Sequence, residues 1–119
     1  MAAGWLSTHV LDTARGLPAA GVGITLYRVT GNRHKTLGEF VTNADGRVDG
    51  PLLTGAGFTV GSYELVFRAG AYLRASGQAA DEVLFLDEVP IRFGITDAAA
   101  HYHVPLLISP FAYATYRGS

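Results

Sequence analysis

Histidines are the residues of this chain best suited to chemistry near neutral pH, because the imidazole pKa of about 6.5 lets the side chain take and release protons. Three of the four histidines, His9, His101 and His103, fall in segments whose composition predicts β-strands. Side chains two residues apart on a strand share a face, so His101 and His103 should lie together while Tyr102 points to the core. A structural hydrogen-bonded pair, an acid–base pair, or a metal site completed by His9 would all fit this spacing.

Arg47 is a further candidate, because it directly follows an Asp-Gly turn at the start of a possible strand. A guanidinium is a permanently charged planar group that binds carbonyl or carboxylate oxygens, although an arginine beside a turn is more commonly a surface charge. His34 lies among polar residues in a turn segment and is expected to be solvated. The chain has no cysteine and no G-x-S-x-G, phosphate-binding glycine loop or H-E-x-x-H pattern, so none of those catalytic classes is indicated.

The C-terminal segment is unusual for a chain end. Tails are commonly small, polar and disordered, whereas this one keeps strand-like alternation and carries Tyr113 and Tyr116. We expect it to be held in an interface or a pocket.

The elements that must position these residues are short strands separated by glycine, proline, asparagine and aspartate. The pattern indicates seven or eight strands and one short helix, and it favours an all-β sandwich over alternating βαβ units. The strands are expected at residues 5–12, 22–29, 35–42, 62–69, 89–95, 100–107 and 111–117, with a possible short strand in 47–53 and the helix at 71–80.

Length and composition limit the classes of function. The 119 residues suit one domain, 1–119, and a hydrophobic fraction of 49% with 16% charged residues predicts apolar contacts between subunits. A net charge of −1 with scattered Lys and Arg argues against binding nucleic acid. No apolar run approaches the roughly 18 residues of a membrane span, so no membrane association is expected. The first residues lack a secretory signal pattern, which predicts a cytoplasmic location.

Three blocks of the chain resemble the hydroxyisourate hydrolase branch of the transthyretin-like family. They are LSTHVLDTARGLPAAGV (6–22), TNADGR (42–47) and HYHVPLLISPFAYATYRGS (101–119), and the segments YELVF (63–67) and EVPIRF (88–93) extend the similarity across the chain. The terminal Tyr116-Arg117-Gly118-Ser119 is the most specific element, because it distinguishes the enzymes of this family from the hormone-carrying transthyretins.

The resemblance implies a fold and an assembly. The fold is a transthyretin-like (prealbumin-like) β-sandwich of two four-stranded sheets with one short helix. The assembly is a homotetramer, a dimer of dimers around a central channel.

The resemblance also implies a reaction with a small-molecule substrate. This is hydrolysis of 5-hydroxyisourate to 2-oxo-4-hydroxy-4-carboxy-5-ureidoimidazoline in urate degradation, without metal or cofactor. The residues it implies as catalytic are His9, Arg47 and His103, with a histidine as general base and the arginine at the substrate and oxyanion. Those it implies as substrate-binding are His101, Tyr116, Arg117, Gly118 and Ser119. The alternatives are a non-catalytic carrier that uses the same channel and a structural β-sandwich domain.

Overall fold

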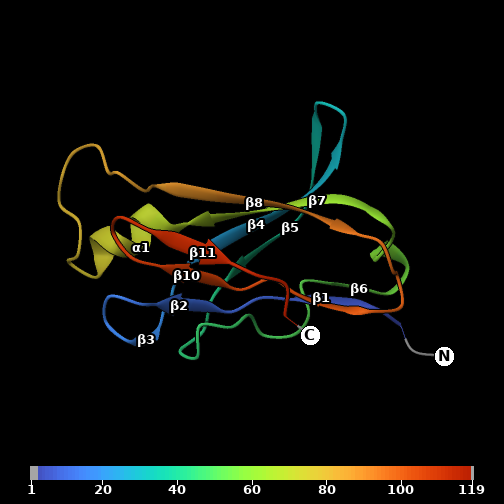
Figure 1. Ribbon diagram of the computed structural model, residues 1–119, viewed down its shortest axis with the longest axis horizontal. Helices are drawn as coiled ribbons and strands as arrows, with labels where there is room; N and C mark the ends of the chain where they lie inside the picture. Colours follow the sequence, from blue (N-terminus) through green and yellow to red (C-terminus); the bar gives the residue numbers. More distant parts are fainter. Residues whose placement is uncertain (1–2, 119) are drawn as a thin grey trace.

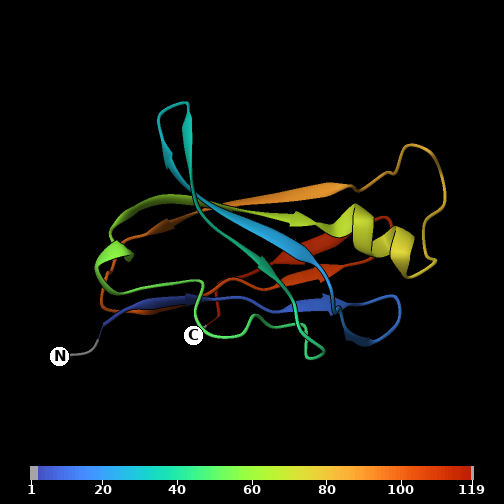
Figure 2. The ribbon, with the colours of Figure 1, turned by 180° about the vertical axis from the view of Figure 1, so that it is seen from behind.

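Two layers of β-structure face each other in the computed structural model, which describes residues 3–118 (Figure 1). The first layer is one antiparallel sheet of four strands in the order β5-β4-β7-β8. Its strands are β4 (Gly23–Thr30), β5 (Arg33–Val41), β7 (Gly61–Arg68) and β8 (Glu88–Ile95). The turn between β4 and β5 projects beyond this layer (Figure 2).

The second layer contains two adjoining sheets, ordered β6-β1-β9 and β11-β10-β2-β3. Their strands are β1 (Trp5–Ser7), β2 (Val10–Asp12), β3 (Leu17–Pro18), β6 (Leu53–Thr54), β9 (His101–His103), β10 (Leu106–Ile108) and β11 (Tyr113–Thr115). The β1–β9 and β2–β10 pairs are parallel, so the N-terminal and C-terminal parts of the chain run side by side. The predicted all-β sandwich with one short α-helix is confirmed.

The second layer divides where the sequence predicted continuous strands. The segment expected at 5–12 is interrupted at Thr8 and His9, and the segment at 100–107 is interrupted at Val104 and Pro105. Proline has no N–H to donate to a ladder. The backbone still bridges the gap, because Val104 N–H donates to Ser7 O at 2.9 Å and Leu106 N–H donates to His9 O at 2.9 Å. The prediction that His9 lies within a strand was therefore wrong, since it lies at the break between β1 and β2.

The core lies between the two layers and follows the predicted alternation. Tyr63, Leu65 and Phe67 of β7 are fully buried, as their period of two predicted. Leu6 and Tyr102 face them from the second layer, where both are also buried. Because these residues point inward, their neighbours on β1 and β9 must point to the opposite, outer face of the second layer.

The α-helix within residues 3–118, α1 (Ala69–Ala75), follows β7 without a loop. It begins two residues before the predicted range 71–80 and ends five residues before the end of that range. Gly77 has φ +76°, a left-handed conformation that ends helices and favours glycine. The buried Tyr72 hydroxyl donates to Asp12 Oδ2 at 2.6 Å, which ties the helix to β2.

Residues 47–52 form a loop, so the possible strand at 47–53 is absent except for Leu53, which begins β6. Gly50 with φ +81° interrupts extended geometry, and Pro51 lacks the N–H that a ladder requires. A short 3₁₀ turn, η1 (Gly55–Gly57), follows. Within residues 3–118, no helix is long and apolar enough to cross a membrane.

Candidate functional site

The candidate site lies on the outer face of the sheet formed by β6, β1 and β9. Trp5 is paired with His101 and Ser7 with His103 in the parallel register of β1 and β9. Because Leu6 and Tyr102 point into the core, these four side chains share the outer face. The prediction that His101 and His103 lie together away from the core is confirmed.

A pocket of about 490 Å³ opens at this face. It is lined by Trp5, Ser7, Thr8, Arg47, Val48, Gly50, Pro51, His101 and His103. A volume of this order suits a small molecule, since ligand sites occupy roughly 300–1,000 Å³. Residues from both ends of the chain and from the loop after β5 therefore meet at one concave surface.

Ser7 connects the two histidines of β9. Its Oγ lies 2.6 Å from Nε2 of His101 and 2.7 Å from Nδ1 of His103. The sequence analysis did not assign Ser7 to the site. The sequence feature that could have identified Ser7 is its position one residue after Leu6, which places its side chain on the face opposite to the core. That position brings Ser7 beside His103 only once β1 is known to pair with β9.

Trp5 forms the wall beside His101. The two rings stack with centroids 3.7 Å apart and an interplanar angle of 4°. This contact orients the His101 imidazole, and the face of an indole ring attracts a positive charge placed over it. Trp5 was also missed as a site residue, because a tryptophan near a chain end has no distinctive local pattern.

The electrostatics of the pocket favour a neutral imidazole at His103. Burial lowers the pKa of His103 below 6.5, and Coulombic interactions with Arg47, and then with His101 and His9, lower it further. A half-buried histidine held neutral at physiological pH retains a lone pair that can accept a proton. His103 is thus chemically suited to act as a general base.

His9 is held differently from the β9 histidines. Its Nε2 lies 2.8 Å from the backbone oxygen of Asp45, and because a carbonyl oxygen only accepts, Nε2 must carry the proton. In the neutral ring, Nδ1 is then the only nitrogen with a free lone pair. His9 is not among the described residues lining the pocket, although it is one of the groups that lower the pKa of His103.

Arg47 reaches the pocket from a tight turn. The side chain of Asn43 accepts hydrogen bonds from the backbone N–H groups of Asp45 (2.9 Å) and Arg47 (3.1 Å). Gly46 has φ +74°, and a Cβ there would lie 2.3 Å from the backbone oxygen of Val10. The turn therefore requires glycine at this position, and its close contact with Val10 places Arg47 beside the β9 histidines.

The C-terminal residues predicted to bind substrate separate into two places. Gly118 N–H donates to His103 O at 2.7 Å, and a Cβ on Gly118 would lie 2.8 Å from the His103 ring, so the tail packs directly on this histidine. Tyr116 and Arg117 instead line a second pocket of about 210 Å³, where the Arg117 guanidinium stacks 4.1 Å from the Tyr102 ring centroid. Ser119 lies outside the described residues.

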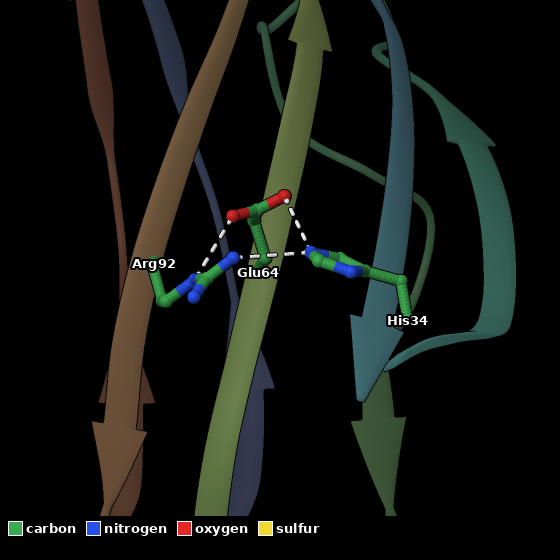
Figure 3. Close-up of polar contacts among 3 residues, drawn as sticks. All are labelled: His34, Glu64 and Arg92. Carbon is green, nitrogen blue, oxygen red and sulfur yellow. Dashed lines mark hydrogen bonds and ion pairs between the residues drawn. The ribbon is translucent and has the colours of Figure 1, made fainter. Parts of the chain in front are cut away.

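His34 lies on the other layer of the sandwich and takes no part in this pocket. Figure 3 shows it on β5, facing Glu64 of β7 and Arg92 of β8. His34 Nε2 is 3.4 Å from Glu64 Oε2 and 3.1 Å from an Arg92 guanidinium nitrogen, while Arg92 Nε lies 3.1 Å from Glu64 Oε1. The expectation that His34 lies in a turn was wrong, since it belongs to β5. Its side chain is exposed, as expected, but it belongs to a surface ion-pair cluster.

The three-histidine metal site considered from the sequence does not form. Among residues 3–118, no three His, Asp or Glu side chains come together in a way that could hold a metal ion. Ser7 lies between His101 and His103 instead, and His9 is bonded to the Asp45 carbonyl.

Comparison with known proteins places this architecture in a family. The model of the HIUase/Transthyretin family matches residues 6–118. A 5-hydroxyisourate hydrolase 2 from Rhizobium meliloti is 59% identical over 116 residues, which cover 98% of this chain and 97% of the relative. The solved 5-hydroxyisourate hydrolase of Klebsiella pneumoniae is 37% identical with a TM-score of 0.80, and the match covers 100% of both chains.

A crystal structure of an (S)-allantoin synthase matches with a TM-score of 0.93 and 49% identity, covering 99% of this chain but 44% of that longer one. One conclusion follows from the fold, from the pairing of β1 with β9, and from a match that spans nearly all the residues. The chain belongs to the HIUase/Transthyretin family.

Proposed function

We propose that this chain is a hydrolase that opens the six-membered ring of 5-hydroxyisourate to give 2-oxo-4-hydroxy-4-carboxy-5-ureidoimidazoline. The relatives named 5-hydroxyisourate hydrolase support this activity, since they are similar over nearly the whole chain. The observation that carries the proposal is the pairing in one pocket of Arg47 with His103, whose pKa is lowered by burial and by neighbouring positive charge.

The reaction breaks a cyclic amide, and each pocket residue has a definable part in it. His103 takes a proton from water as the water oxygen attacks the ring carbonyl. Arg47 offsets the negative charge that develops on the carbonyl oxygen. The protonated imidazole then donates to the departing nitrogen, so the C–N bond breaks and a carboxylate forms. General base catalysis of this kind contributes about 10²–10⁴-fold to the rate.

The other residues have proposed supporting parts. His9, fixed with its proton on Nε2 by the Asp45 carbonyl, would hold or polarise the substrate from the edge of the site. His101, Tyr116, Arg117, Gly118 and Ser119 would bind substrate. The contact of Gly118 with His103 supports a tail that borders the pocket, and the pocket beside Tyr116 is separate from it within this protomer.

A homotetramer is part of this proposal. Exposed aromatic side chains on the C-terminal segment, Tyr113 and Tyr116 among them, provide surface that association would cover. Sedimentation equilibrium is expected to give four copies of the chain, and a monomer at micromolar concentration would contradict the assembly. One domain over residues 1–119 and a cytoplasmic location also remain proposals; limited proteolysis checks the first and cell fractionation the second.

A coupled ultraviolet assay tests the activity. Urate oxidase generates 5-hydroxyisourate in the cuvette, and the protein should accelerate its decay. His103→Ala and Arg47→Ala should each lower kcat/KM by about 10²-fold or more. His34→Ala is the matched control, because it removes a histidine of the opposite layer, and it should leave the rate unchanged. A folded wild-type protein that gives no acceleration would refute the hydrolase and favour a small-molecule carrier.

A further inference from the structure

The hydroxyl of Ser7 imposes opposite roles on the two histidines of β9. A serine hydroxyl has one proton to donate, so it can donate to only one of the two ring nitrogens that it contacts. The short distances to His101 Nε2 (2.6 Å) and His103 Nδ1 (2.7 Å) therefore require at least one of these nitrogens to donate to Ser7 Oγ. If both donated to the two lone pairs of the oxygen, the Ser7 hydroxyl proton would have no acceptor among residues 3–118. The arrangement that satisfies every group has one nitrogen donating and the other accepting, so the tautomers of the two rings are coupled.

Only one of the two arrangements leaves His103 able to act as a base. If Ser7 donates to His103 Nδ1, the neutral ring carries its proton on Nε2 and has no free lone pair. If His103 Nδ1–H donates to Ser7 Oγ and Ser7 donates to His101 Nε2, the lone pair of His103 Nε2 is free. The second arrangement is the one that a general base at this position requires.

We propose that Ser7 is a positioning residue that holds His103 in its Nδ1–H tautomer and passes the proton gained in catalysis on to His101. This rests on the proposed function. His103 Nε2 takes the proton of the attacking water, His103 Nδ1–H moves to Ser7 Oγ, and the Ser7 hydroxyl proton moves to His101 Nε2. The net result is one proton removed from water and a positive charge on His101. The reverse transfer supplies the departing nitrogen with its proton.

The surroundings of the two rings favour this direction of transfer. His103 is half-buried and faces the positive charge of Arg47 and the titratable rings of His9 and His101, all of which oppose a cation there. His101 stacks on Trp5 at 3.7 Å, where the indole face stabilises an imidazolium. Ser7 lies between the two rings and contacts both, so no other group is needed to carry the proton.

Two substitutions separate this role from a merely structural one. Ser7→Ala removes the hydroxyl, whereas Ser7→Thr keeps it on a β-branched residue that suits a strand. Ser7→Ala should lower kcat by about 10- to 100-fold with little change in KM, and Ser7→Thr should stay within about threefold of wild type. Ser62→Ala, an exposed serine on β7, is the matched control and should leave kcat unchanged.

Nitrogen-15 NMR of the histidine rings gives a readout that does not depend on turnover. At pH 8 the wild-type His103 should be protonated on Nδ1, and Ser7→Ala should move that proton to Nε2. A wild-type His103 with its proton on Nε2 would overturn the proposal. So would an unchanged kcat in Ser7→Ala, or a Ser7→Thr variant as impaired as Ser7→Ala. Wild-type protein that fails to accelerate hydroxyisourate decay would refute the proposed function instead, with the tautomer still measured.

Discussion

Replacing Tyr72 with phenylalanine tests how the helix is fastened to the sandwich. The Tyr72 hydroxyl donates to Asp12 Oδ2 at 2.6 Å, and the same carboxylate accepts from Gln78 at 2.8 Å and from the backbone N–H of Arg15 at 2.9 Å. Burial opposes ionisation of Asp12, but these hydrogen bonds outweigh it and lower its pKa. The variant Tyr72→Phe leaves a buried carboxylate with one donor fewer.

The size of the loss follows from the kind of hydrogen bond that is removed. Burial, and next the hydrogen bond to Asp12, raise the pKa of Tyr72 from 10.0 to about 12, so the phenol stays protonated and donates at neutral pH. Hydrogen bonds to charged groups are worth about 1.5–3 kcal/mol. We therefore expect Tyr72→Phe to lower the free energy of unfolding by about 2 kcal/mol.

Thermal unfolding followed by circular dichroism measures this loss. At about 2.1 cal/mol/K per residue, a chain of 119 residues should lose about 8 °C in Tm for a 2 kcal/mol change. Protein concentration must be held constant, because association shifts the apparent Tm. Below the transition, kcat/KM should be unchanged, since Tyr72 does not line the histidine pocket.

Tyr27→Phe is the control for Tyr72→Phe. Tyr27 is only half-buried, and its hydroxyl has no hydrogen-bond partner among the described residues, so the Tm should change by less than about 2 °C. The reasoning is refuted if both variants unfold at the wild-type temperature, because the buried Asp12 would then tolerate the loss of its donor at no cost.

Two further predictions concern the pocket. Gly46→Ala should cost about 1–2 kcal/mol for the left-handed backbone and lower kcat/KM by up to about 100-fold, since the new Cβ collides with Val10 O and displaces Arg47. Gly31 also has positive φ (+60°) but has open space around it. Gly31→Ala should therefore lower the free energy of unfolding through the left-handed backbone but keep the activity in the same assay. The lowered pKa of His103 places the acid limb of kcat/KM below pH 6.5, with activity lost as pH falls through the folded pKa. Below pH 6.5 the unfolded chain binds more protons at His103 than the folded chain does, so His103 should also lower the free energy of unfolding as pH falls. Urea titrations between pH 5 and 8 measure this loss. A titration midpoint of His103 above pH 6.5 in the folded protein contradicts both expectations.

Local pattern was sufficient to predict much of the fold. The alternation of Tyr63, Leu65 and Phe67 predicted a half-buried strand, and these residues are fully buried in β7. The Asp-Gly pair before Arg47 predicted a turn, and Gly46 there adopts positive φ. Both features depend on residues close in sequence, where the period of a strand or the freedom of a glycine is visible directly.

The strand boundaries in the second layer could not be predicted as well from local pattern. Pro105 lies at the second break, but residues 5–12 contain no proline, so nothing local predicts the break at His9. That break is visible only once β1 is paired with β9 and β2 with β10. The helix occupies residues 69–75 and not the predicted 71–80, since Ala69 and Gly70 are already helical and buried at its start and Gly77, with φ +76°, follows its end.

By itself, the sequence determined that His101 and His103 share a face, that Arg47 follows a glycine turn, and that strands with one short helix form a sandwich. Tertiary structure alone decided that Ser7 lies between the two histidines, that Trp5 stacks on His101, and that Tyr116 and Arg117 border a different pocket from the histidines. The reason is the range of the interactions. Side-chain direction repeats with a local period, whereas pairing β1 with β9 joins residues 94–96 positions apart, and only the hydrophobic packing of the complete chain selects that register.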